Sequence, residues 1–325
     1  MTTEQFIVTP PPHLKEKDTV SSAMRDVGIA LIPVSVTALY FFRLNALFLM
    51  VVCLLAAAIT DIVVRALRGR HNSLRDGSAL LTGFLVALTY SPTGSWWLAV
   101  LATVIGVGLA KELMGGLGWN RFNPALFGRV SIIILGPLFV LLNREFAGLA
   151  VRFPMVDAIT QATPMALLKQ GLPGPGYLSL FLANAGGALG ETSALALLLG
   201  GAYLLYRGHI SWRTPVSCIA AVFVLTAVFG RDPLFHVLAG GLLLGAIFMA
   251  TDWVTSPITE RGQIIYGVSI GVLVVVFRLF LAPVEGVAFS ILIMNAFVPM
   301  IDKATRRLTF GEVPALPATG KSETA

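Results

Sequence analysis

The sequence contains few charged residues and few cysteines, and both shortages restrict the classes of protein to which it can belong. Only 12% of its 325 residues are Asp, Glu, Lys or Arg, against about a quarter in soluble domains, and the mean hydropathy is +0.82. The two cysteines, Cys53 and Cys218, stand alone in apolar runs, without the spacing that holds zinc or an iron–sulfur cluster. This composition predicts a polytopic membrane protein whose cysteines pack as small apolar residues.

The first 25 residues have no apolar core of their own, unlike a cleavable signal peptide, and predict a cytoplasmic tail at residues 1–25. The net charge of +6 could attract nucleic acid. However, the Lys and Arg residues lie in short segments between apolar runs and form no single basic face. We therefore expect these charges to follow membrane topology and expect no nucleic-acid partner.

Apolar runs near the roughly 20 residues that cross a bilayer fill residues 26–302. They predict an all-α membrane domain with about ten transmembrane helices. The runs lie near residues 27–42, 45–64, 78–92, 96–113, 124–142, 191–206, 214–229, 234–250, 263–280 and 284–301. Several are short or contain Gly and Pro, which is typical of helices that are broken inside a membrane protein.

The distribution of Lys and Arg predicts the orientation, because short cytoplasmic loops are enriched in both. In a ten-helix topology one side receives the basic residues that flank the first, second, sixth and tenth spans: Lys15, Lys17, Arg25, Arg65, Arg68, Arg70, Arg75, Arg207, Arg213, Lys303, Arg306 and Arg307. Both termini, including a C-terminal tail at 303–325, are then cytoplasmic. The long segment 143–190 faces the other compartment.

A weak internal echo predicts two structural repeats of five spans. Residues 83–92 and 245–257 share a Gly, a Thr six residues later and a Ser-Pro pair. Each is followed by a segment that contains Asn and Pro, NPALFG at Asn123 and NAFVP at Asn295. Such repeats would place a functional centre where their broken helices meet.

A polar stretch, DAITQATPMALL at residues 157–168, interrupts this apolar chain. Thr163 can cap a helix whose first turn begins at Pro164. Pro164 also biases Thr163 toward extended backbone, which would present its hydroxyl for modification. The local pattern leaves both interpretations open.

The residues Asp157-Ala-Ile-Thr160-Gln-Ala-Thr163 resemble the D-x-x-[S/T]-x-A-T motif of the RnfD/NqrB family, the membrane subunits of ion-translocating redox complexes. Three further segments resemble the family in the same order: GLGWNRFNPALFGR from Gly116, GALGETSALA from Gly187 and MATDWVTSP from Met249. The resemblance covers about residues 25–305, and the short chain is more similar to the Rnf branch. Many members have Gly where this chain has Gln161, a difference that spares the threonine acceptor.

The resemblance implies a bacterial inner-membrane subunit with FMN joined through its phosphate to Thr163 on the periplasmic side. Asp157 and Thr160 would help a flavin transferase recognise the site. It also allows a noncovalent riboflavin. Iron–sulfur and flavin subunits would be partners in electron transfer between ferredoxin and NAD, coupled to movement of Na⁺ or H⁺.

Four other residues are candidates, each with a structural alternative. Glu191 and Thr192 open the sixth span, where amides and hydroxyls could hold polar flavin atoms or simply cap the helix. Glu112 and Asp252 are acids at span ends, where ionised groups mark ion routes or specific pairs, and Lys111 could neutralise a neighbour. Two more acids, Asp61 and Asp302, are expected to be solvated helix ends.

Two competing classes share these features. Broken helices, internal repetition and membrane acids also describe a stand-alone transporter or channel without a redox cofactor. The second competing class is a scaffold protein in which the acids and Thr163 have purely structural roles. A flavin subunit would be coloured, whereas a plain carrier would not.

Overall fold

The computed structural model describes residues 19–69, 76–92, 94–146, 164–170, 172, 174–182, 187–281 and 285–306. Every regular element among these residues is a helix, which confirms the all-α prediction. Both tails lie mostly outside the described residues, as does much of the segment 143–190. The predicted site residues Asp157, Thr160 and Thr163 lie outside them as well.

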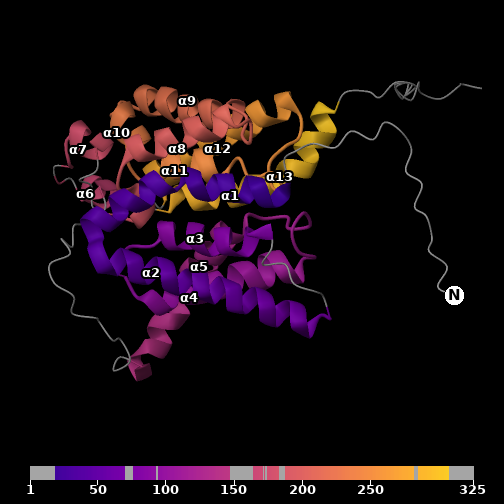
Figure 1. Cartoon of the computed structure of the whole chain (residues 1–325). Coiled ribbons are helices and arrows are strands. Elements are labelled where there is room, and N and C mark those ends of the chain that lie inside the picture. The colour runs from indigo at the N-terminus through magenta and orange to yellow at the C-terminus, as the bar shows by residue number, and fades with distance from the viewer. Residues whose placement is uncertain are drawn as a thin grey trace, which may run out of the picture.

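The helices form two groups (Figure 1). The first half of the chain contains α1 (Val20–Ala30), α2 (Ile32–Leu67), α3 (Ser78–Thr89), α4 (Trp96–Ile105), the π-helix η2 (Gly106–Leu113) and α5 (Pro124–Phe146). The second contains α8 (Ala194–Tyr206), α9 (Arg213–Val228), α10 (Pro233–Leu238), α11 (Leu242–Leu244), the π-helix η5 (Gly245–Met249), α12 (Glu260–Phe280) and α13 (Gly286–Thr305). Between them come α6 (Pro164–Lys169), α7 (Tyr177–Leu182) and the 3₁₀-helix η4 (Leu189–Glu191). The helices of the second half of the chain form one group, against which α1 lies, and α3, α4 and α5 form another with most of α2 (Figure 1).

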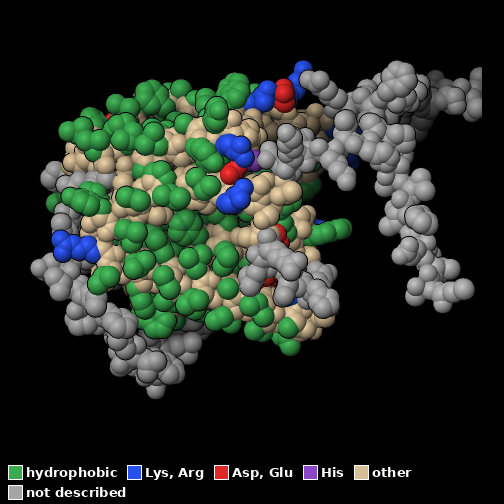
Figure 2. All heavy atoms as spheres, viewed as in Figure 1, with side chains coloured by type: hydrophobic (Ala, Val, Ile, Leu, Met, Phe, Trp, Pro, Cys, Tyr) green, Lys and Arg blue, Asp and Glu red, His purple; other side chains and the backbone are tan. Residues whose placement is uncertain are grey.

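Four helical stretches are long and apolar enough to cross a membrane: Val20–Leu67, Trp96–Leu113, Glu260–Phe280 and Gly286–Thr305. Four shorter apolar helices accompany them: Ser78–Thr89, Pro124–Leu135, Ala194–Tyr206 and Arg213–Val228. Apolar side chains cover much of the visible surface (Figure 2), as in a protein surrounded by lipid. The chain is therefore a multi-pass membrane protein, while the number ten and the two repeats stay predictions.

The predicted interruptions coincide with specific backbone features. Inside α2, Arg43 has φ 50° and ψ −130°, and this kink separates the predicted spans 27–42 and 45–64. In the eighth predicted span, α10 stops at Leu238 and the chain passes through Gly240 (φ 69°) and Gly241 (φ 66°) before α11 begins. Glycine suits both positions because other residues rarely adopt a positive φ.

The first residues of α5 pack directly against α4 through glycine. A Cβ atom on Gly128 would lie 2.0 Å from the carbonyl oxygen of Ala102, and one on Gly106 would lie 2.4 Å from that of Pro124. Small residues at such crossings let two helix backbones approach closely in a membrane. This contact fixes where α5 starts, next to the cavity described below.

We expect Gly128→Ala to destabilise the protein by about 1–3 kcal/mol, because the added methyl group forces the two helices apart. Thermal unfolding of the detergent-purified protein measures the effect. Gly28→Ala in α1 is the matched control, since a Cβ atom there meets nothing within 4 Å. Equal midpoints for the two variants would contradict this account of the crossing.

Candidate functional site at the interrupted helices

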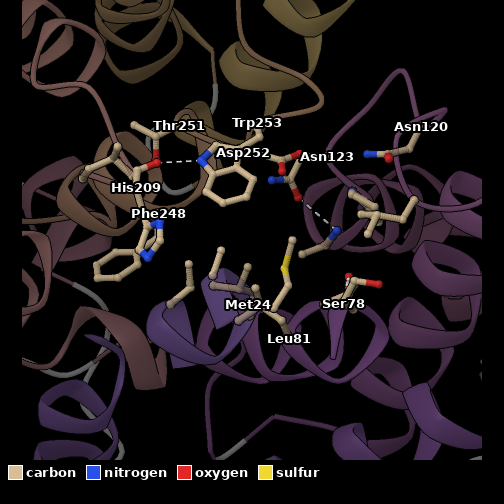
Figure 3. A pocket seen from close by; sticks show the side chains of 18 of the residues that line it. Met24, Ser78, Leu81, Asn120, Asn123, His209, Phe248, Thr251, Asp252 and Trp253 are labelled. Carbon is tan, nitrogen blue, oxygen red and sulfur yellow. Dashed lines mark hydrogen bonds between the residues drawn. The ribbon is translucent and has the colours of Figure 1, made fainter. Parts of the chain in front are cut away.

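A cavity of about 80 Å³, lined by apolar side chains and several polar ones, lies where interrupted segments of the two halves meet. Figure 3 shows its side chains converging from α1, α3, the segment before α5 and the segment after η5. Its polar lining combines carboxylate, amide, hydroxyl, ammonium and imidazole groups: Asp252, Asn120, Asn123, Ser78, Thr82, Thr251, Lys111 and His209. A cavity of this kind can hold water or a small ion.

Asp252 is the acid of this cavity. Its Oδ2 accepts a hydrogen bond of 2.9 Å from the Thr255 hydroxyl. No Lys or Arg in the described part of the chain forms an ion pair with it. A carboxylate without a fixed counter-charge beside a cavity is suited to meeting a mobile cation.

Two asparagines hold the irregular connection that carries Asp252. The Oδ1 atom of Asn123 caps α5, accepting bonds of 3.0 and 3.3 Å from the amides of Ala125 and Leu126. Its Nδ2 donates to the Met249 carbonyl at 3.2 Å, across 126 residues of sequence. Asn295 on α13 donates to the Thr255 carbonyl at 3.3 Å. Asn123 and Asn295, which occupy matching positions in the two predicted repeats, therefore both donate to the segment that carries Asp252.

Trp253 is also fixed at the cavity. Its indole N–H donates to the His209 carbonyl at 2.6 Å, and the His209 ring lies 2.7 Å from Asp26 Oδ2. Arg207 donates to the same Asp26 carboxylate at 2.8 Å. This chain of contacts joins α1, the end of α8 and the connection after η5, and no pattern in the sequence predicted it.

Glu112, the other predicted ion-pathway acid, lies in an ionic network that pairs its Oε1 and leaves its Oε2 without a hydrogen bond among the described residues. Its Oε1 is 3.0 Å from Arg65 and 3.5 Å from Lys111, and the Arg68 guanidinium donates to its backbone carbonyl. Lys111 also lies 3.1 Å from Asp61. These contacts favour the structural alternative for Glu112, and they confirm that Lys111 neutralises its neighbours.

The expectation that Asp61 is a solvated helix end was wrong. Asp61 is fully buried, because η2 packs on α2 and brings Lys111 against it from 50 residues away in sequence. Asp302 lies near the end of α13 as expected, and its Oδ1 accepts a bond of 3.0 Å from the Ile258 amide.

The start of α8 is capped by its own residues. Ser193 accepts a hydrogen bond of 3.2 Å from the Ala196 amide, and the Thr192 hydroxyl donates to the Leu189 carbonyl at 2.5 Å. Ser193 is therefore the residue that caps α8, and contact of Glu191 or Thr192 with flavin stays a prediction. Both cysteines are buried, which confirms their packing role.

A second polar cluster, which the sequence did not predict, surrounds the break after α10. The Arg278 guanidinium on α12 donates to the carbonyls of His236, Ala239 and Gly240, the last two at 3.0 Å. In the first half, Arg129 similarly donates to the Thr89 carbonyl at the end of α3 and pairs with Glu285 at 2.9 Å. The signal that could have found both sites is a single arginine within each apolar run.

The interrupted spans and the polar side chains between them define the class as an all-helical, multi-pass membrane protein. The chain belongs to the NQR2, RnfD, RnfE family, whose model matches residues 7–311.

Named relatives match over nearly their whole length. The chain is 38% identical to the D subunit of the Na⁺-translocating ferredoxin:NAD⁺ oxidoreductase complex of Acetobacterium woodii, covering 94% of this chain and 95% of the relative. It is also 38% identical to the proton-translocating counterpart of Clostridium ljungdahlii, with 94% and 96% covered. A third relative, the D subunit of the ion-translocating oxidoreductase complex of Stutzerimonas stutzeri, is 38% identical with 91% and 93% covered. Equal identity to sodium and proton relatives leaves the ion open.

We expect Lys111→Met to destabilise the protein by about 3–5 kcal/mol, because it leaves buried Asp61 and Glu112 with one cation fewer. The double variant Asp61→Asn/Lys111→Met should recover much of this loss, since Glu112 keeps Arg65. Thermal unfolding in detergent compares both with Lys303→Met, a change at an exposed lysine. A single variant as stable as this control would contradict the structural role of the network.

Proposed function

We propose that this chain is the D subunit of an ion-translocating ferredoxin:NAD⁺ oxidoreductase complex in a bacterial inner membrane. The names and coverage of its relatives support this proposal. In it, the subunit carries FMN covalently on Thr163 and relays electrons, while iron–sulfur and flavin partner subunits perform the reactions with ferredoxin and NAD. Both cysteines of this chain are buried and isolated, so we assign the iron–sulfur centres to those partners.

The observation that best supports the flavin is the surroundings of the acceptor motif. Pro164 directly follows Thr163, so covalent geometry keeps their Cα atoms about 3.8 Å apart. Pro164 and Met165 are both buried, and Met165 packs in a cluster with Leu180, Phe235 and Ala239 on α7 and α10. The residues after the acceptor are thus anchored at the break of the eighth predicted span.

The FMN, when bound, would accept and pass on electrons, and its phosphoester bond would keep it from being lost to the periplasm. The chain's own role is to hold the acceptor segment against α10 and to separate it from the Asp252 cavity. A flavin transferase that recognises Asp157, Thr160 and Thr163 would install the group.

We propose that the translocated Na⁺ or H⁺ passes the cavity at Asp252. Glu112 is less suited, since its network already contains Arg65 and Lys111. In this mechanism, the chain's segment that carries Asp252 would change its preferred arrangement when the flavin held at Thr163 gains negative charge. Electron flow would then drive ion passage.

The noncovalent riboflavin stays a prediction. An engineered cavity of about 150 Å³ holds one benzene ring, so the cavity of about 80 Å³ suits waters and an ion better than three fused rings. We therefore route no step through riboflavin.

Clustered charges support the proposed orientation, with both termini cytoplasmic and the segment 143–190 periplasmic. Arg213 at the start of α9 pairs with Glu260 at the start of α12 at 2.9 Å, and Arg207 at the end of α8 pairs with Asp26. These basic residues belong to the loops that we assign to the cytoplasm.

We expect Thr163→Ala to abolish flavin fluorescence of the subunit band in a denaturing gel, because only a covalent flavin survives denaturation. The protein must be made in a host that contains the flavin transferase. Thr103→Ala, which removes a buried hydroxyl bonded to its own helix, should leave the fluorescence unchanged. A wild-type band without fluorescence, and colourless protein, would favour the stand-alone transporter instead.

We expect Asp252→Asn to lower ferredoxin-driven Na⁺ or H⁺ uptake into inverted vesicles about tenfold or more, equivalent to roughly 1.4 kcal/mol. The covalent flavin should be retained. Glu260→Gln is the control, since that acid is exposed and pairs at the surface. Wild-type uptake by Asp252→Asn would remove this residue from the ion route.

A further inference from the structure

Helix α10 carries, two residues before its end, a histidine whose ring nitrogens have no hydrogen-bond partner among the described residues. His236 is 2% exposed, and neither Nδ1 nor Nε2 has a hydrogen bond within the described part of the chain. Buried polar side chains nearly always have a partner, and an exception calls for a specific explanation. An unpaired imidazole can both donate and accept, so it can serve a ligand that brings its own polar atoms.

The charge around His236 restricts what that ligand can be. Arg278 is 6% exposed, donates to three carbonyls at the break after α10, and leaves its Nε without a partner. No carboxylate of the described residues forms an ion pair with it. Glu191 lies beside the neighbouring Gly241, where a Cβ atom would be 2.8 Å from its Oε1. Arg278 supplies a positive charge beside His236, which would attract a polar ring that gains negative charge.

The same break touches the segment that follows the proposed flavin acceptor. A Cβ atom on Gly240 would lie 2.8 Å from Met165 Cγ and 2.9 Å from Arg278 Nη2. Met165 is two residues after Thr163, and its side chain is 1% exposed. Three features therefore lie around the pair Gly240 and Gly241. They are Arg278, the unpaired ring of His236 and Met165, which anchors the acceptor segment.

We propose that His236 is the hydrogen-bonding partner of the flavin ring on Thr163, and that Arg278 supplies the positive charge beside it. This inference rests on the proposed function, because it requires the covalent flavin. A donor and a cation near the polar edge of a flavin stabilise the more negative, reduced ring and raise its midpoint potential. His236 is then a positioning and tuning residue for the redox group.

The test is a redox titration of the purified complex, monitored by flavin absorbance. Subtracting the titration of a Thr163→Ala complex isolates the flavin on this subunit from those on its partners. His236→Phe should shift that flavin to a more negative potential, because the hydrogen bond is lost. His236→Gln, which keeps an N–H donor, should restore a potential near that of the wild type. Thr226→Val, which removes a buried hydroxyl bonded to its own helix, is the control.

Fluorescence of the subunit in a denaturing gel distinguishes a failure of the proposed function from a failure of the role proposed for His236. A wild-type band without fluorescence overturns the proposed function itself. A fluorescent His236→Phe band whose flavin has the wild-type potential overturns the role of His236 and leaves the proposed function standing.

A measurement on the unmutated complex covers the case in which His236→Phe does not assemble. Redox-induced infrared difference spectra are recorded with and without ¹⁵N-labelled histidine. We expect an imidazole band that shifts with the label in the wild type and is absent from the Thr163→Ala complex. A flavin signal without any such band would overturn the inference.

Discussion

A helix that stops inside a bilayer leaves its last carbonyl groups without donors, and lipid cannot supply any. The fold meets this constraint with side chains from other helices. Arg129 donates at the end of α3, Arg278 at the end of α10 and Asn123 at the end of η5. Because Asn123 starts α5 and Met249 ends η5, its bond also joins the two halves of the chain. At these three helix ends, a side-chain donor from elsewhere in the chain reaches the free carbonyl groups.

The two arginines differ in how their charge is compensated. Arg129 pairs with Glu285, so the end of α3 carries a closed ion pair. Arg278 donates to carbonyl oxygens, so the end of α10 keeps an excess of positive charge. The network of Asp61, Glu112, Lys111 and Arg65 is balanced, with two acids and two bases. Neither Arg278 nor Asp252 forms an ion pair within the described part of the chain, and the acid near the Arg278 cluster is Glu191, beside Gly241.

Predictions from the sequence were right where residues close together in the chain determine the structure. Hydropathy separated the spans on either side of Arg43, and the Asn-Pro pair at 123–124 indicated a helix start that the structure contains. The predictions failed where a partner comes from far along the chain. Nothing near Asp61 reveals that Lys111 will face it, and nothing near Arg278 reveals that α10 will stop beside it. The acceptor motif was recognisable only by resemblance, and Thr163 lies outside the described residues.

The segment α11–η5 connects the Arg278 cluster to the Asp252 cavity. It begins at Leu242, directly after Gly241 beside that cluster, and ends at Met249, shortly before Asp252. Close contacts hold it on several sides: a Cβ atom on Gly245 would lie 2.3 Å from Val287 Cγ1, and one on Gly201 would lie 2.8 Å from Ile247 Cγ2. Dense packing of this kind resists gradual deformation. In the proposed function, a change of charge at one end of the segment would therefore reach Asp252 as a displacement of the whole segment, and this would couple the electron relay to ion movement.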